Sequence, residues 1–237
     1  MRRIVGLLAF LATAVSCLNF TYQCKGKEAV GASFPENLLP LVYLADIRSS
    51  ISNGHSQENV SFFQEKRFAE QLWVKEIMRN KTNIIGIGQI NVTFDGTNCG
   101  AVTGKSPNKP IYALDEFSKK VLNFDGMSLR QLLEEIRRVF KQNSFSASVT
   151  YGDIEAVKWT GCRNISGDNI ALQVEVIFAG NGTKQPFSPL MKNPSLLAIH
   201  ILPFNVSTDP ELAASVTFDI TKLQNPEFVG NELPPGT

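Results

Sequence analysis

The sequence lacks the residue patterns by which most enzymes and metal-binding proteins are recognised. Its 237 residues include two histidines, His55 and His200, and neither lies in a known catalytic motif. It contains no His-Glu-x-x-His pair, and its four cysteines are spaced too widely for a zinc site. The adjacent acidic pairs, such as Glu134 with Glu135, fall on predicted helices, where neighbours point to different sides. We therefore predict no catalytic residue, no metal and no cofactor, and an enzyme is the least favoured class.

An excess of charge of either sign is also absent. Lysine and arginine number 23 and aspartate and glutamate 22, which gives a net charge of +1. A nearly neutral chain provides no electrostatic attraction for nucleic acid or for an anionic membrane. After the first apolar run there is no second one long enough to cross a bilayer. We therefore expect no nucleic-acid partner and no membrane span.

The first sixteen residues have the pattern of a signal peptide. Arg2 and Arg3 precede an apolar run over residues 4–15, and Ala14-Val15-Ser16 fits the rule for cleavage after Ser16. Cleavage after Cys17 is a second choice, and an uncleaved anchor, a buried first helix or a bacterial lipoprotein signal are the alternatives. A run this short does not span a bilayer stably. The pattern predicts a secreted, extracellular protein.

Asn-x-Ser/Thr sequons are the most abundant motif in the chain. Each marks a potential surface position, because a bulky glycan cannot be packed in a core. Together with the signal peptide, they predict an N-glycosylated protein. The seven asparagines are Asn19, Asn59, Asn80, Asn91, Asn164, Asn181 and Asn205.

The four cysteines predict at least one disulfide bond if the protein is secreted. The preferred bond joins Cys99 to Cys162, each beside a predicted strand, and would stabilise the fold by about 4 kcal/mol in the chain-entropy model. Cys24 is then either free or bonded to Cys17.

Residues 17–83 are predicted to form a helical N-terminal region. Within them, residues 61–79 carry apolar side chains at helical spacing, including Phe62, Phe63 and Leu72. Residues 84–94 then change to the alternation of a strand and end in the turn dipeptide Asp95-Gly96.

Residues 84–225 are predicted to form an α+β sandwich, followed by a flexible tail over residues 226–237. Two helices are expected, over residues 112–124 and 128–142, and the second begins with Ser128 followed by Gln131, a capping box. Strands are expected over residues 146–162, with a break at Gly152-Asp153, and over residues 170–178, 196–204 and 214–220. The predicted fold class is therefore α+β, an antiparallel sheet with helices packed on one face, preceded by the helical N-terminal region.

This order resembles the SEA module of extracellular glycoproteins, over residues 90–94, 129–140 and 154–178. The resemblance implies helices packed on an antiparallel sheet. Many SEA modules cleave themselves at a Gly-Ser bond in the hairpin, but Ser166 here does not follow a glycine. We therefore predict no self-cleavage.

A second stretch, Ala-Glu-Gln-Leu-Trp-Val-Lys-Glu-Ile at residues 69–77 with Cys99 downstream, resembles the CAP-like surface antigens of coccidian parasites. Their later tryptophan-containing helix and cysteine pair are missing. The favoured function is a non-catalytic extracellular interaction with an unknown protein partner. The alternatives are a CAP-like surface antigen and a binder of a small apolar ligand such as a lipid, for which some of the sixteen phenylalanines would line a pocket.

Overall fold

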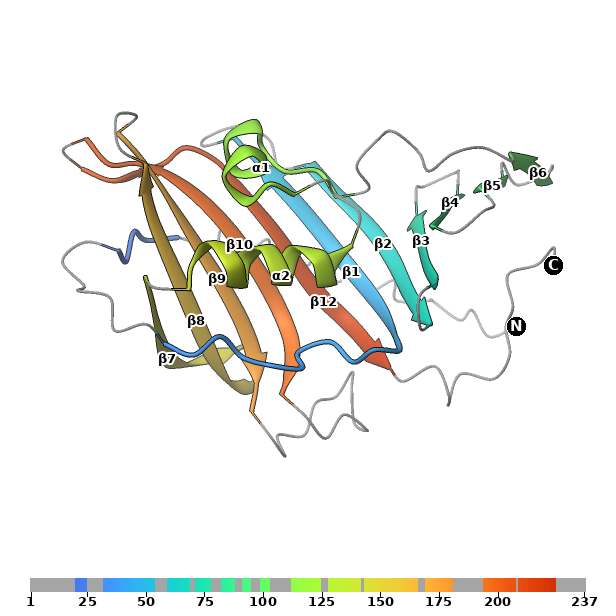
Figure 1. Cartoon of the computed structure of the whole chain (residues 1–237), viewed down its shortest axis with the longest axis horizontal. Helices are drawn as coiled ribbons and strands as arrows, with labels where there is room; N and C mark the ends of the chain where they lie inside the picture. Colours follow the sequence, from blue (N-terminus) through green and yellow to red (C-terminus); the bar gives the residue numbers. More distant parts are fainter. Residues whose placement is uncertain are drawn as a thin grey trace, which may run out of the picture.

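The described part of the chain forms one large antiparallel sheet with two helices on one of its faces (Figure 1). The structure is a computed structural model. It describes residues 20–24, 32–53, 59–68, 71–77, 82–87, 91–94, 99–102, 112–124, 128–141, 143–165, 169–180, 194–207 and 209–224. The predicted signal peptide and the predicted tail lie outside these residues. None of the described helices is long and apolar enough to cross a membrane.

Fourteen elements are described. The helices are α1 (Glu116–Leu122) and α2 (Leu129–Val139). The strands are β1 (Tyr43–Ser52), β2 (Asn59–Phe68), β3 (Gln71–Ile77), β4 (Thr82–Ile87), β5 (Asn91–Phe94), β6 (Cys99–Val102), β7 (Ser144–Tyr151), β8 (Ile154–Ile165), β9 (Ile170–Ala179), β10 (Ser195–Asn205), β11 (Glu211–Leu212) and β12 (Ser215–Gln224).

The sheet joins two runs of hairpins through the last strand. Its order is β6-β5-β4-β3-β2-β1-β12-β10-β9-β8-β7, and the short β11 pairs with β10. Strands β1–β6 follow one another directly, as do β7–β10, and β12 lies between β1 and β10 and pairs with both. In the chain, the two helices lie between β6 and β7, that is, between the two runs of hairpins. They pack over the sheet (Figure 1).

The two faces of the sheet are set by the alternation of side chains along each strand. On β9, Leu172, Val174 and Val176 belong to the same apolar cluster as the buried residues of α2, and we call this side the helix face. Gln173 and Glu175 point to the other side, which we call the far face. Because β9 is covered on both sides, nearly all of its side chains are buried.

Helix α2 begins and packs as its sequence predicts. The Ser128 hydroxyl accepts a hydrogen bond from the Gln131 amide at 3.2 Å, which caps the helix. Its buried residues recur at helical spacing, and the helix ends at Phe140, directly above Gly161 of β8. A Cβ atom at Gly161 would lie 2.7 Å from the Phe140 Cβ, so only glycine allows this close approach. The strands predicted around residues 170–178, 196–204 and 214–220 are also present.

The predicted fold class and the helical N-terminal region are wrong. The protein is predominantly a β-sheet, and residues 61–79, predicted as a helix, contain most of β2 and the whole of β3. On β2, Phe63 and Glu65 are buried on the helix face, whereas the preceding residue, Phe62, points to the other face and is half exposed. Residues 84–94, predicted as one strand, belong to two strands, β4 and β5.

Candidate functional site

The candidate site is the space between the helix face of the sheet and the two helices. The side chains that meet there are almost all apolar and fully buried, and they form the main hydrophobic core of the protein. From the helices and their flanks these are Leu122, Phe124, Leu129, Leu132, Leu133, Ile136 and Phe140; from the sheet they include Ala45, Ile47, Phe63, Val74, Trp159, Leu172, Val174, Val176, Leu196, Ile199, Ile201, Val216, Phe218 and Ile220.

Two surface hollows lie beside the helices. One, of about 250 Å³, lies between residues 34–39 and α2; its walls include Phe34, Leu38 and Leu133, and its rim carries charged residues of both signs. The other, of about 400 Å³, is lined by residues of α1 and its C-terminal end, among them Lys119, Lys120 and Phe124. The first hollow adjoins the apolar layer, so it marks a side from which that layer can be reached.

One carboxylate interrupts the apolar layer. Glu65 of β2 is 0% exposed, and its two oxygens accept three hydrogen bonds. The Tyr43 hydroxyl donates to one oxygen. The Tyr112 hydroxyl donates to the other at 2.5 Å, and the Leu129 amide donates to the same oxygen at 3.2 Å. Since Leu129 is the first residue of α2, the carboxylate also lies at the positive end of the helix dipole. Glu65 therefore connects the helix layer to the sheet.

Burial and hydrogen bonding shift the pKa of Glu65 in opposite directions. Burial raises the pKa of Glu65, and the hydrogen bonds from Tyr112, Tyr43 and Leu129 only partly offset this. Burial, together with the neighbouring Glu65 carboxylate, raises the pKa of Tyr43 and of Tyr112 well above the usual range. The two tyrosines therefore keep their protons at all moderate pH values and serve as donors.

The raised pKa of Glu65 predicts a pH-dependent stability. The folded protein retains the Glu65 proton at pH values where the unfolded chain has lost it, so this contribution is full below the unfolded value near 4.5 and is lost as pH rises through the folded pKa. We expect the free energy of unfolding of the wild type, minus that of Glu65→Gln, to fall as pH rises above 4.5. Urea titrations at several pH values measure this difference. A difference that is constant or rises with pH would contradict the assignment.

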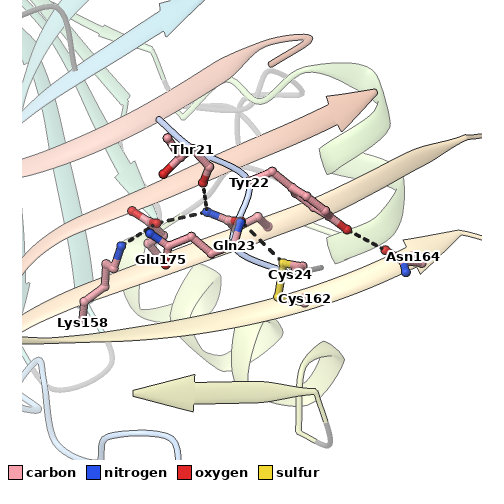
Figure 2. The surroundings of a disulfide bond; sticks show 9 residues. Thr21, Tyr22, Gln23, Cys24, Lys158, Cys162, Asn164 and Glu175 are labelled. Carbon is pink, nitrogen blue, oxygen red and sulfur yellow. Dashed lines mark hydrogen bonds and ion pairs between the residues drawn. A yellow bond between two sulfur atoms is a disulfide. The ribbon is translucent and has the colours of Figure 1, made fainter. Parts of the chain in front are cut away.

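The far face carries a second polar group, beneath residues 20–24 (Figure 2). The side-chain amide of Gln173 accepts from the Gln23 amide at 2.8 Å and donates to the Thr21 carbonyl at 3.2 Å, so it binds the backbone of this segment at two points. Phe20 contacts the His200 ring and Tyr22 contacts Phe204, with ring centroids 5.2 and 5.3 Å apart. These contacts place the N-terminal segment across β8–β10.

Glu175 is the centre of the charges under this segment. It lies 2.9 Å from the Lys158 amine and 3.2 Å from Nδ1 of His200, and Gln173 donates to it at 3.1 Å. Burial raises the pKa of Glu175, but the hydrogen bonds and charges of His200 and Lys158 outweigh burial, and the net shift is downward. The carboxylate is therefore ionised and held by its partners. The sequence analysis predicts no catalytic role for His200 and gives no indication of this group.

The disulfide differs from the predicted one. Cys162 is bonded to Cys24, and not to Cys99, with a Cα–Cα distance of 5.8 Å (Figure 2). Cys162 lies on the far face of β8 opposite Gln173, where residues 20–24 cross the sheet, whereas Cys99 begins β6 at the opposite edge. Sequence separation gave no indication of this arrangement. Cys17 lies outside the described residues.

The predicted glycosylation sites lie on several elements. Asn59, Asn164 and Asn205 are exposed, at the ends of β2, β8 and β10. Asn164 accepts a hydrogen bond from the Tyr22 hydroxyl at 3.3 Å. Asn91 begins β5. Asn19, Asn80 and Asn181 lie outside the described residues.

Comparison with protein families identifies the fold. Residues 33–228 match the model of a family described as the nematode 1st LolA-like domain. The chain belongs to this family. The resemblances to the SEA module and to the coccidian CAP-like antigens are therefore wrong. The LolA-like domain accounts for the long antiparallel sheet, and the SEA-like order of elements covered only part of it.

Similar solved structures are more distant. A DUF1329 family protein from Desulfovibrio piger is 7% identical, with a TM-score of 0.34, over 78% of this chain and 85% of that one. A LolA superfamily protein from Nitrosomonas europaea is 8% identical, with a TM-score of 0.35, over 79% of this chain and 88% of that one. Both alignments are too loose for comparison residue by residue. No curated protein matches the sequence.

Proposed function

We propose that this LolA-like domain binds a lipid or another apolar ligand between the helix face of the sheet and helices α1 and α2, without catalysing a reaction. The observation that carries the proposal is the continuous apolar layer between them. Membership of a LolA-like family supports a role in binding or carrying apolar molecules. The proposal adopts the apolar-ligand alternative of the sequence analysis in place of the protein-interaction role favoured there.

The way the helices are attached supports a ligand site that opens. In the described part of the chain, no backbone–backbone hydrogen bond joins α1 or α2 to a strand, and the Leu129 amide of α2 bonds instead to the side chain of Glu65. The sheet, by contrast, is held by continuous backbone pairing. The helices can therefore move away from the sheet without breaking its ladder.

The size of the hollow beside α2 also requires such a movement. Pockets for drug-sized ligands measure about 300–1,000 Å³. The hollow next to the apolar layer measures about 250 Å³, and the layer itself is filled by side chains. A lipid chain would therefore enter by displacing α2 and taking over its apolar contacts with the sheet.

The test uses tryptophan fluorescence and a brominated acyl chain, because bromine quenches a tryptophan that it contacts. The chain has two tryptophans, and Trp159 is 1% exposed on the helix face. In the Trp73→Phe variant, where Trp159 is the single tryptophan, we expect saturable quenching by a brominated diacylglycerol. Trp159→Phe is the matched variant and should lose this signal. Absence of saturable quenching in the Trp73→Phe variant would refute the proposed site.

We further propose that the protein is secreted and N-glycosylated. The exposure of Asn59, Asn164 and Asn205 and the Cys24–Cys162 bond support this location. Treatment of protein from a eukaryotic culture medium with an N-glycan-removing enzyme should increase its mobility on a gel. Replacing Asn205 by Gln should remove one step of the glycosylation ladder, whereas Asn53→Gln, outside any sequon, should not. Recovery of unglycosylated protein from the cytosol alone would contradict the proposal.

A further inference from the structure

Glu65 is the feature of the apolar layer that a ligand would have to satisfy. Among the described residues, it is the one buried carboxylate on the helix face; the other buried carboxylate, Glu175, lies on the far face with His200. A ligand that enters between the helices and the sheet passes Glu65, because this side chain bonds to both layers. Its chemistry therefore bears on which head group the site accepts.

The donors to Glu65 come from two sides of the site. Tyr43 belongs to β1, so its hydroxyl stays with the sheet. Tyr112 precedes α1 and Leu129 begins α2, so their donors belong to the helix layer. When the helices separate from the sheet, Glu65 keeps one donor and loses two. A carboxylate in apolar surroundings is costly without partners, and an ionised carboxylate can only accept. The entering group must therefore supply N–H or O–H donors.

Arg67 provides the opposite charge on the same face. It follows Glu65 by two residues on β2, so both side chains project to one side of the sheet. Its positive charge lowers the pKa of Glu65, which places the guanidinium near the carboxylate. In the described part of the chain the Nε atom of Arg67 is buried and has no hydrogen-bond partner. A guanidinium donates only, and its geometry fits an anionic oxygen acceptor such as a phosphate or a carboxylate.

We infer that the ligand is a zwitterionic amphiphile, with an ammonium group that donates to Glu65 and a phosphate group that accepts from Arg67. The inference rests on the proposed function and names the ligand class of the same site. The two poles of such a head group are neighbours, as Glu65 and Arg67 are on β2. A free fatty acid would pair its carboxylate with Arg67 but supply no donor to Glu65, and an uncharged lipid would leave Nε of Arg67 without an anionic acceptor.

The experiment compares lipids that share their acyl chains and differ in the head group. The probe is the brominated diacylglycerol bound to the Trp73→Phe protein, and the competitors are a phosphatidylethanolamine, its N-acetylated derivative and a phosphatidylglycerol, all in short-chain form. We expect the phosphatidylethanolamine to compete about tenfold better than the other two, the effect of one hydrogen bond to a charged group. Equal competition by all three would overturn the inference but leave the proposed function intact.

Two variants assign the poles of the head group. Glu65→Gln should abolish the preference for phosphatidylethanolamine over its N-acetylated form. Arg67→Gln should weaken the binding of phosphatidylethanolamine without weakening the binding of diacylglycerol. The controls are Glu211→Gln and Arg138→Gln, whose side chains are exposed and away from Glu65. If a variant does not fold, the wild-type competition series decides. Failure of both the brominated diacylglycerol and a brominated phosphatidylethanolamine to quench Trp159 would refute the proposed function, and the inference with it.

Discussion

Replacing Ile136 by aspartate is expected to prevent the protein from folding stably. Ile136 is 0% exposed in the middle of α2, within the apolar cluster that includes Leu172, Val174 and Val176 of β9. Aspartate there would bury a carboxylate without a partner, at a cost of several kcal/mol, against a total stability of about 5–15 kcal/mol for an ordinary domain. We expect the yield of soluble protein to collapse, and any that is recovered to unfold at much lower urea concentration.

The neighbouring residue provides a matched control. The side chain of Arg137 is 60% exposed, and its ion pair with Glu36, at 3.4 Å, is on the surface. Such pairs contribute about 0–1 kcal/mol, so Arg137→Asp should have a small effect on the free energy of unfolding. Equal destabilisation by Ile136→Asp and Arg137→Asp would mean that the buried face of α2 is assigned wrongly.

The parts of the fold that sequence predicts are those with a strong local pattern. Helix α2 has a capping serine and an apolar stripe of period 3.6, and both operate within a few residues. Along strand β9, apolar residues that face the helices alternate with Gln173 and Glu175, which point to the far face. Asn169, with φ of 43°, lies in the turn before the strand. These two elements can be predicted from the local sequence pattern alone, because the pattern does not depend on which distant segments they contact.

Strands β2 and β3 show why the N-terminal half was predicted wrongly. Phe62, Phe63 and Leu72 satisfy a helical stripe as well as the faces of two strands, so the apolar pattern does not distinguish them. What decides is pairing with β1, which itself pairs with β12, more than 150 residues later in the chain. Such contacts cannot be read from a local window.

The candidate site was missed for the same reason. On a predicted helix Glu65 is one of several charged residues on a solvated surface, whereas on β2 it follows Phe63 on a buried face. The signal that could have found it is the alternation Phe63–Glu65–Arg67, in which charged residues occupy positions expected to be apolar. The donors from Tyr43, Tyr112 and Leu129 come from three separate segments, and no spacing in the sequence indicates their convergence.

The second large effect is expected from the Cys24–Cys162 disulfide. The bonded residues are 138 positions apart, and closing a loop of this length stabilises the fold by about 4–5 kcal/mol in the chain-entropy model. The bond also holds residues 20–24 over the buried Glu175 group, where Gln173 binds their backbone. Without it, that segment can leave the far face and expose a network of buried charges to water.

Cys24→Ser and Cys162→Ser should therefore destabilise the protein by similar amounts, and the double variant by no more than either alone, because each removes the same bond. Urea unfolding in the absence of reductant measures the decrease in the free energy of unfolding for each variant. Cys99→Ser is the control that separates the observed pairing from the one predicted from sequence. We expect a non-reducing digest of Cys99→Ser still to contain the Cys24–Cys162 peptide. If Cys99→Ser instead frees Cys162 for alkylation while Cys24→Ser does not, Cys162 is bonded to Cys99, and the N-terminal segment is not fixed to β8.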